Sequence, residues 1–204
     1  MNELQILKSD ITQSRVVESE LDTGTPLVAG EILLKVDKFG FSANNVTYAV
    51  AGDQLGYWQF FPASSNENET WGIIPVWGFA DVVASSAEGV DAGERIFGYY
   101  PTNSYLKMQN IKVLESRLVD RAEHRSKLPP GYNTYRRVGK EADYDSNMDN
   151  MRMLLWPLYI TSFCLWDSLQ HNDWHGAKQV IVISASSKTS IGLGYALAAD
   201  TDAP

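Results

Sequence analysis

The pattern of apolar residues changes once along this 204-residue chain, and that change limits the fold more than any other sequence feature. From Leu4 to about Val119, short runs rich in β-branched and aromatic residues are separated by Gly, Pro and Asn, which is typical of a small barrel or sandwich. From Asp149 onward, a helix-like segment is followed by a β-branched run and a second helix-like segment. The change of pattern predicts two domains.

Alternating apolar residues predict the strands of the first domain. Between residues 30 and 38, Ile32, Leu34 and Val36 point to one face, as a half-buried strand requires. Further strands are predicted at residues 79–84, 95–99 and 111–114. The Pro-, Gly- and Tyr-rich stretch at residues 127–147 is expected to be irregular.

The second half predicts two helices around one strand. Residues 149–170 are apolar nearly all round, which favours a helix buried between two domains, and Pro157 predicts a kink or break at Trp156. Residues 179–184 form a continuous β-branched run, as in a strand covered on both faces of a parallel sheet. A helix is predicted at residues 191–199. The expected division is a β-rich domain at 1–148, a connecting helical segment at 149–177 and the start of a second domain at 178–204.

Charge and cysteine content exclude several classes of partner. With 17 basic and 25 acidic residues the formal net charge is -8, so neither nucleic acid nor an anionic membrane is expected to bind. The longest uncharged apolar run, residues 153–166, is shorter than the roughly 20 residues that cross a bilayer. The single cysteine, Cys164, excludes an internal disulfide. A cytoplasmic protein that carries no membrane segment is expected.

Several segments resemble the medium-chain dehydrogenase/reductase superfamily. Residues 30–36 (Gly-Glu-Ile-Leu-Leu-Lys-Val) and 93–98 (Gly-Glu-Arg-Ile-Phe-Gly) are similar to early barrel segments of that superfamily. Residues 132–138 and 154–163 resemble an uncharacterised bacterial and fungal branch known by a domain-of-unknown-function label. The resemblance implies an α/β chain, in which a GroES-like catalytic barrel precedes the first strand, loop and helix of a Rossmann-type nucleotide-binding domain.

The same resemblance implies a zinc-independent, quinone-reductase-like site. Ser42 stands where zinc enzymes of the superfamily have a cysteine ligand, and Trp77 with Gly78 stands at their His-Glu pair. A hydroxyl and an indole cannot replace thiolate and imidazole around zinc, so no metal is expected.

Four polar residues after the first clear strand are the candidates for contact with substrate and cofactor. Ser42, Asn45 and Tyr48 are expected to orient a substrate carbonyl, and Asn44 to contact the cofactor. A simple turn at Asn44 and Asn45 explains the asparagines equally well.

The predicted nucleotide-binding loop follows the β-branched run, where a helix N-terminus could meet a pyrophosphate. Its residues are Ser184, Ala185, Ser186, Ser187, Lys188, Thr189, Ser190, Ile191 and Gly192. Only Gly192 aligns with a glycine of the usual glycine-rich motif, whereas the serines and Lys188 offer donors to phosphate. The alternative is that Thr189 or Ser190 is only a helix cap and Lys188 a solvated lysine.

Two smaller groups have both a structural and a functional interpretation. Arg136 and Arg137 could contact a ribose phosphate, but an exposed arginine pair is more often surface. Trp71, Trp77, Tyr99 and Tyr100 could line a substrate cleft, but core positions are more common for aromatic residues, and we expect Trp77 in the core.

The resemblance therefore predicts an NAD(P)H-dependent reductase of a small carbonyl, enone or quinone substrate. The choice between NADP and NAD depends on a residue expected beyond Pro204, because the chain is expected to stop within the nucleotide-binding domain. This chain alone is expected to be inactive, and a homodimer fits the complete parent. A non-enzymatic binding or scaffold protein that retains the dehydrogenase fold is the alternative.

Overall fold

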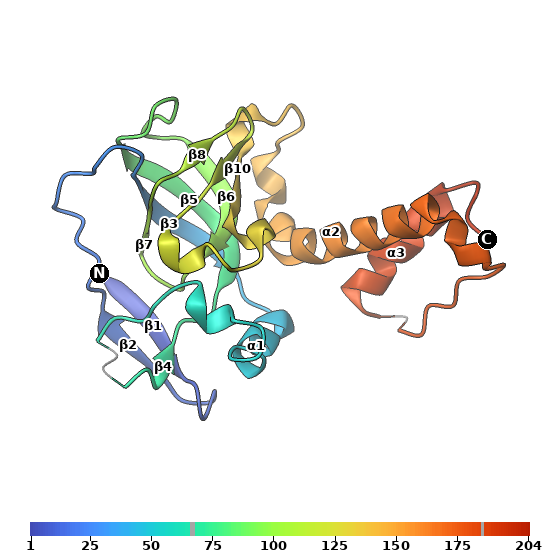
Figure 1. Ribbon diagram of the computed structural model, residues 1–204, viewed down its shortest axis with the longest axis horizontal. Helices are drawn as coiled ribbons and strands as arrows, with labels where there is room; N and C mark the ends of the chain where they lie inside the picture. Colours follow the sequence, from blue (N-terminus) through green and yellow to red (C-terminus); the bar gives the residue numbers. More distant parts are fainter. Residues whose placement is uncertain (66–67, 185) are drawn as a thin grey trace. The chain divides into compact units, whose positions relative to one another are not determined.

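The computed structural model describes residues 1–65, 68–184 and 186–204. The chain divides into two compact units, Met1–Asn147 (unit 1) and Met148–Pro204 (unit 2). Unit 1 consists mainly of antiparallel sheet with short helices, and unit 2 contains two longer helices (Figure 1). The chain is thus a mixed α/β protein.

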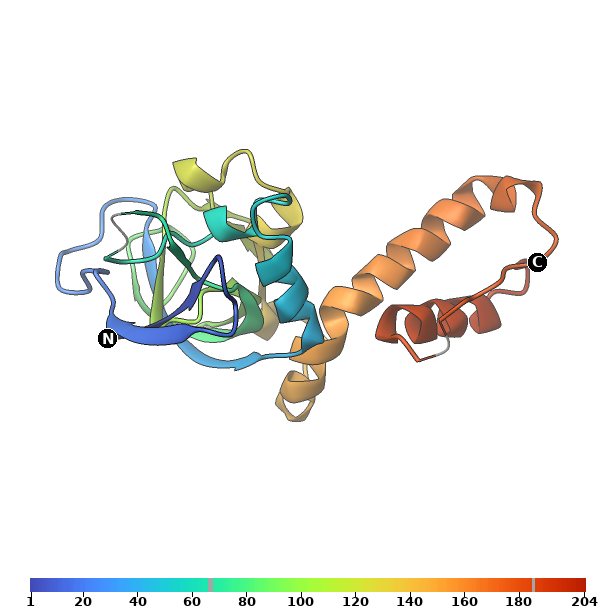
Figure 2. The same cartoon turned by 90° about the horizontal axis from the view of Figure 1, so that it is seen from below.

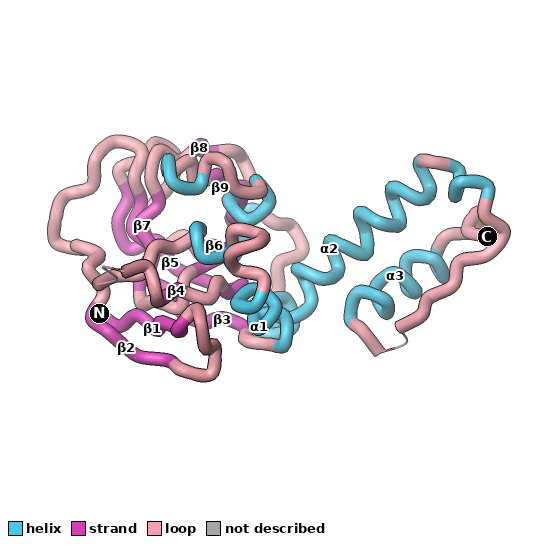
Figure 3. The backbone as a smooth tube through the Cα atoms, turned by 60° about the horizontal axis from the view of Figure 1, so that its bottom comes forward, coloured by secondary structure: helices cyan, strands magenta, loops and turns pink. Residues whose placement is uncertain are grey.

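Unit 1 contains two antiparallel sheets. The larger sheet has the strand order β7-β3-β5-β6-β10-β9-β8 and curls into a half-barrel, and the smaller has the order β2-β1-β4 (Figure 3). The strands are β1 (Asn2–Leu7), β2 (Ser14–Glu18), β3 (Ile32–Gly40), β4 (Trp71–Gly72), β5 (Val76–Ser85), β6 (Arg95–Tyr100), β7 (Tyr105–Met108), β8 (Lys112–Val113), β9 (Arg117–Val119) and β10 (Thr134–Arg137).

The strongest strand predictions are confirmed. Strand β3 begins two residues after the predicted start, and its Ile32 and Leu34 are buried while Lys35 is exposed. Strands β5 and β6 cover the predicted segments 79–84 and 95–99, and β8 is a two-residue part of 111–114. The main core of unit 1 is formed by residues of β3, β5, β6, β7, β9 and β10 and of the segments between them. It contains Ile32, Leu34, Phe60, Phe61, Ile73, Val76, Ala80, Val82, Val90, Ile96, Tyr99, Tyr100, Leu106, Met108, Leu118 and Tyr135.

Two elements of unit 1 contradict the sequence-based expectation. The stretch 127–147, expected to be irregular, contains β10, which pairs with both β6 and β9. Its Arg137 is buried and paired with Glu94, so its polar sequence conceals a central strand. Asn44 and Asn45 do not form a simple turn, because they belong to helix α1 (Ala43–Val50).

Unit 2 is built from two helices that pack side by side. Helix α2 (Asp149–His171) is followed by a short 3-10 helix (Asp173–Gly176) and helix α3 (Lys188–Ala199) (Figure 2). Helix α2 continues through Pro157, so the predicted break at Trp156 does not occur. Proline removes a single backbone donor, and the remaining turns of this long helix stay hydrogen-bonded. In the described part of the chain, no helix is long and apolar enough to span a membrane.

The predicted strand at residues 179–184 is wrong for this structure. None of the described residues of unit 2 forms a strand, and Ile181 and Ile183 are 82% and 97% exposed. A β-branched run becomes a strand only where a neighbouring strand accepts its backbone hydrogen bonds. The expected burial of α2 all round is also not seen, because Met151, Tyr159 and Phe163 are exposed.

Candidate functional site

Helix α1 and its N-cap Ser42 contain the four site residues predicted in this segment, and two of them, Ser42 and Asn45, stabilise the helix itself. Asn45 Oδ1 accepts a hydrogen bond from Ser42 N at 2.7 Å, and the Ser42 hydroxyl accepts one from Asn44 N at 3.4 Å. Asn45 Nδ2 also donates to Pro75 O at 2.9 Å, which ties α1 to the segment before β5. These side chains cap and anchor the helix, as Ser and Asn often do at helix N-termini.

Another of these four residues, Tyr48, belongs to a group of aromatic side chains that we call the tyrosine cluster: Tyr48, Tyr57, Trp77, Tyr99 and Tyr132. Ring centroids of Tyr48 lie 4.6 Å from Tyr57 and 5.8 Å from Tyr99. Tyr99 lies 4.6 Å from Tyr132 and 5.2 Å from Trp77. Tyr99 is fully buried, whereas the other four rings are partly exposed. The cluster therefore consists of one buried residue, Tyr99, in contact with partly exposed aromatic residues.

The polar atoms of the cluster are unequally satisfied. The hydroxyls of Tyr57 and Tyr132 form a hydrogen bond at 3.2 Å. Among the described residues, Tyr99 Oη has no hydrogen-bond partner although it is buried. The Trp77 indole lies close to the Tyr48 hydroxyl, but its buried Nε1 makes no hydrogen bond of normal geometry within the described part of the chain. Buried donors without an acceptor are rare and costly, so this arrangement requires an explanation.

Burial raises the pKa values of three phenols of the cluster. It raises the pKa of Tyr48, and it raises the pKa values of Tyr99 and Tyr132 well above the ordinary value of 10.0. Neighbouring phenols act in the same direction on Tyr99, because each disfavours a negative charge on the others. At neutral pH the cluster therefore consists of neutral hydrogen-bond donors.

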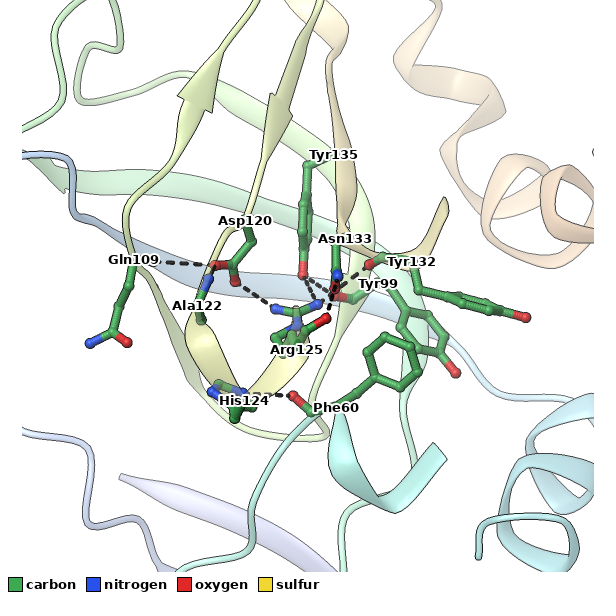
Figure 4. Close-up of polar contacts among 10 residues, drawn as sticks. All are labelled: Phe60, Tyr99, Gln109, Asp120, Ala122, His124, Arg125, Tyr132, Asn133 and Tyr135. Carbon is green, nitrogen blue, oxygen red and sulfur yellow. Dashed lines mark hydrogen bonds and ion pairs between the residues drawn. The ribbon is translucent and has the colours of Figure 1, made fainter. Parts of the chain in front are cut away.

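A buried ion pair fixes the backbone on which the cluster stands (Figure 4). Arg125 and Asp120 have side chains that are each 1% exposed, and Arg125 Nη1 donates to Asp120 Oδ2 at 2.6 Å. Arg125 Nη2 donates to the Tyr135 hydroxyl at 3.0 Å and to Tyr132 O at 3.4 Å. The Tyr135 hydroxyl in turn donates to Tyr99 O at 2.6 Å. One guanidinium thus fixes the main chain at Tyr99 and at Tyr132.

Further contacts complete this network. Asn133 Nδ2 donates to Arg125 O at 3.0 Å, and Asp120 Oδ1 accepts a hydrogen bond from Ala122 N at 3.0 Å. Burial raises the pKa of the Tyr135 phenol to about 12, although the Arg125 charge acts against that rise. In Figure 4 the rings of Tyr99 and Tyr132 both extend away from Arg125. The network therefore holds the main chain that carries the Tyr99 and Tyr132 rings.

Sequence reasoning found only part of this site. Tyr48 was predicted as a site residue, whereas Trp77, expected in the core, is partly exposed beside it. Tyr57, Tyr132 and Arg125 were not identified, because only the folded chain brings residues so distant in sequence together. Their one visible signal is the frequency of aromatic residues between positions 57 and 135.

The predicted nucleotide-binding loop lies in unit 2 and begins helix α3. Ser187 is the N-cap, and its hydroxyl accepts a hydrogen bond from Ser190 N at 3.1 Å. The suggestion that Thr189 or Ser190 caps the helix is therefore wrong, because both lie within α3, as does Ile191. The helix begins at Lys188, three residues before the predicted start. Ala185 lies outside the described residues.

Gly192 has a clear packing role. A Cβ atom at this position would lie 2.8 Å from Ser162 Oγ and 3.1 Å from Ser162 Cβ on helix α2. Ser162 is fully buried, and its hydroxyl donates to Thr189 O at 2.7 Å. The glycine therefore permits the close approach of α3 to α2.

The start of α3 suits a phosphate group but does not form the whole dinucleotide site. Ser184, Ser186 and Lys188 are exposed near the helix N-terminus, where hydroxyl and ammonium donors join the positive end of the helix dipole. The segment 179–184 before it lacks the strand that ends beside the pyrophosphate in a dinucleotide fold. Among the described residues, no group of three or more His, Cys, Asp or Glu side chains could hold a metal ion.

Comparison with known families gives a match over most of the chain. A family described as a protein of unknown function (DUF2855) matches residues 39–204, which is most of the chain. No curated protein matches the chain. The matched region includes the tyrosine cluster, the Arg125 network and helix α3.

Proposed function

The chain belongs to the DUF2855 family of proteins of unknown function, and we propose that it is a zinc-independent NAD(P)H-dependent reductase that binds a small carbonyl substrate at the tyrosine cluster. The observation that carries the proposal is the cluster of neutral phenols around buried Tyr99. Neutral donors in a water-poor site stabilise the negative charge that develops on a carbonyl oxygen during reduction.

Tyr48 is the residue that would act on this oxygen. Its ring is partly exposed and meets those of Tyr57 and Tyr99, so its hydroxyl lies among the other donors. A bound nicotinamide coenzyme would supply a hydride to the carbonyl carbon. Tyr48 Oη would donate a hydrogen bond to the carbonyl oxygen and then its proton, which gives the alcohol and a Tyr48 phenolate; this partly exposed phenolate would take a proton back from solvent. The Arg125 network would keep Tyr99 and Tyr132 in place during this step.

The exposed donors at the start of α3 would hold the coenzyme phosphates. Ser184, Ser186 and Lys188 have the appropriate chemistry, and Ser187 stabilises the helix whose N-terminus they surround. The resemblance to medium-chain dehydrogenases supports this assignment. The GroES-like and Rossmann-type descriptions of the two units are part of the same proposal.

Fluorescence titration with NADPH and NADH tests coenzyme binding. Wild-type protein is expected to bind at least one of them, and Ser186→Ala with Lys188→Ala is expected to weaken binding about tenfold, because phosphate loses two donors. Lys178→Ala removes another exposed lysine of unit 2 and is the matched control. Absence of binding by the wild type, or equal binding by the double variant, would contradict the coenzyme assignment.

Turnover of a carbonyl substrate with the reduced coenzyme, measured in the longest protein that contains this chain, tests the role of Tyr48. Tyr48→Phe keeps the ring and is expected to lower kcat about a hundredfold or more, the usual contribution of a positioned proton donor. Tyr105→Phe removes a phenol from outside the cluster, and its kcat should remain at the wild-type value. Equal kcat values for Tyr48→Phe and the wild type would exclude Tyr48 as the donor.

A non-enzymatic binding or scaffold protein is the second candidate. It is favoured by one observation: residues 179–184 do not form the strand that a dinucleotide site needs. The two candidates differ in the titration above, because a scaffold protein would bind neither NADPH nor NADH.

A further inference from the structure

The hydroxyl of Tyr99 combines three properties that suit a ligand-binding group. It is fully buried, it has no hydrogen-bond partner among the described residues, and its ring belongs to the cluster proposed to bind substrate. The adjacent Tyr100 shows the ordinary solution for a buried phenol, because its hydroxyl donates to Ile96 O at 3.0 Å. Strand β6 thus presents one satisfied and one unsatisfied phenol on successive residues.

We propose that Tyr99 Oη donates a hydrogen bond to an oxygen of a neutral aromatic ligand, so that Tyr99 determines which molecules the cluster accepts. This inference rests on the proposed function for the location of the site and adds the ligand class. The buried Nε1 of Trp77, also without a hydrogen bond of normal geometry in the described part of the chain, is a second donor beside Tyr99.

The surroundings of Tyr99 select an aromatic ligand. Its ring meets Tyr132 at 4.6 Å and Tyr48 nearly edge-on at 5.8 Å between centroids, and both of these rings are partly exposed. A ligand reaches Tyr99 Oη when the Tyr132 ring rotates aside and the ligand takes its place, while Arg125 holds the Tyr132 main chain and Tyr48 stays beside the ligand. A flat aromatic molecule restores the lost ring contacts, whereas an aliphatic one does not.

The same surroundings exclude an anionic ligand. Arg125 is the cation that supports Tyr99 and Tyr132, but it lies behind the cluster and its charge is matched by Asp120 at 2.6 Å. The phenols of Tyr99 and Tyr132, whose pKa values burial raises further above neutrality, carry no charge that could pair with an anion. A carboxylate that entered the cluster would lose its hydration without gaining a free cation. A ketone, aldehyde or amide oxygen loses far less.

The test compares acetophenone, benzoate and cyclohexyl methyl ketone as ligands in titrations followed by ligand-observed NMR. Acetophenone is expected to bind the wild-type protein at least about tenfold more tightly than either of the other two. Tyr99→Phe keeps the ring, removes only the hydroxyl and is expected to weaken acetophenone binding about five- to tenfold. Tyr100→Phe is the matched control, because it removes a neighbouring buried hydroxyl and should leave binding unchanged.

The stability of the ligand-free protein is a second measurement, in which the two variants are expected to differ in the opposite sense from their binding. Tyr99→Phe removes a hydroxyl without a protein partner and should leave the midpoint of urea unfolding unchanged or raised, whereas Tyr100→Phe should lower it. Loss of binding in Tyr99→Phe with retained stability therefore cannot come from misfolding.

Three results would overturn the inference: no binding of acetophenone by the wild type, equal binding by Tyr99→Phe, or benzoate binding as tight as that of acetophenone. Different outcomes would contradict the proposed reductase function. Acetophenone binding that depends on Tyr99 but occurs without coenzyme turnover would contradict the function and keep the inference. Coenzyme turnover by the wild type, together with acetophenone binding that Tyr99→Phe leaves unchanged, would keep the reductase function and contradict the inference.

Discussion

At the scale of single residues, the stability of unit 1 depends on charged side chains that are fully or partly buried. Arg137, placed on the surface by sequence reasoning, is 7% exposed and forms a two-pronged pair with Glu94, with Nε–Oε2 and Nη2–Oε1 distances of 2.8 and 2.7 Å. Its Nη2 also donates to Gly89 O at 2.7 Å. The pair joins β10 to the turn that precedes β6 and so connects two neighbouring strands of the half-barrel.

This pair predicts how stability depends on pH. Partial burial raises the pKa of Glu94, but hydrogen bonds from Arg137 and Asp91 N outweigh it, so the pKa lies below the ordinary value of 4.5. Because the pKa is lowered on folding, the stabilisation is complete above 4.5 and is lost as pH falls through the lowered value. Glu94→Gln should cost about 1–3 kcal/mol at neutral pH and flatten the acid limb of a urea-unfolding series. The exposed Glu88→Gln should match the wild type, and an equally steep acid limb in Glu94→Gln would exclude the pair as its cause.

At the scale of elements, prediction succeeded where local pattern alone decides the structure. From Leu34 to Asp37 strand β3 alternates apolar and charged residues, so its approximate bounds followed from the sequence, although Leu33, expected on the opposite face, is buried as well. Helix α1 was missed because two asparagines open it, and β10 because its buried Arg137 reads as a surface residue. The run 179–184 failed for another reason, since β-branched residues do not reveal whether a neighbouring strand exists.

The candidate site likewise contains residues that the sequence predicts and residues that only the folded chain brings together. Tyr48 followed from a resemblance tied to a local motif, whereas Tyr57, Tyr99 and Tyr132 meet only through pairing and packing across the unit. The predicted motif glycine, Gly192, has a packing role that no motif states, because the contact with Ser162 on α2 depends on how the two helices cross.

Two glycines of α3 test that packing role directly. At Gly192 an added Cβ lies 2.8 Å from Ser162 Oγ, whereas at Gly194 it meets nothing within 4 Å. Gly192→Ala should therefore lower stability by about 1–3 kcal/mol through overpacking, whereas Gly194→Ala should raise it by up to about 1 kcal/mol through helix propensity. Thermal unfolding followed by circular dichroism measures both. A stabilising Gly192→Ala would show that α3 does not pack closely on α2.

At the scale of the whole molecule, the two units differ in how well they bury their apolar residues. Unit 1 has a main core of sixteen buried residues. Unit 2 leaves many large apolar side chains exposed: Met148, Met151, Leu154, Leu155, Tyr159, Ile160, Phe163, Leu165, Ile181, Val182, Ile183, Ile191 and Tyr195. So much apolar surface on a unit of this size favours association.

The exposed run at residues 179–184 should dominate that association. Ile181 and Ile183 are 82% and 97% exposed, and the backbone around them forms no strand pairing in the described residues. Ile181→Ser with Ile183→Ser should therefore reduce light scattering and binding of a hydrophobic dye, with little change in the unfolding of unit 1. Val16→Ser with Val50→Ser removes side chains that are 63% and 72% exposed on unit 1 and is the matched control. If the control pair reduced scattering as much as the isoleucine pair, the association would come from general surface hydrophobicity and not from this run.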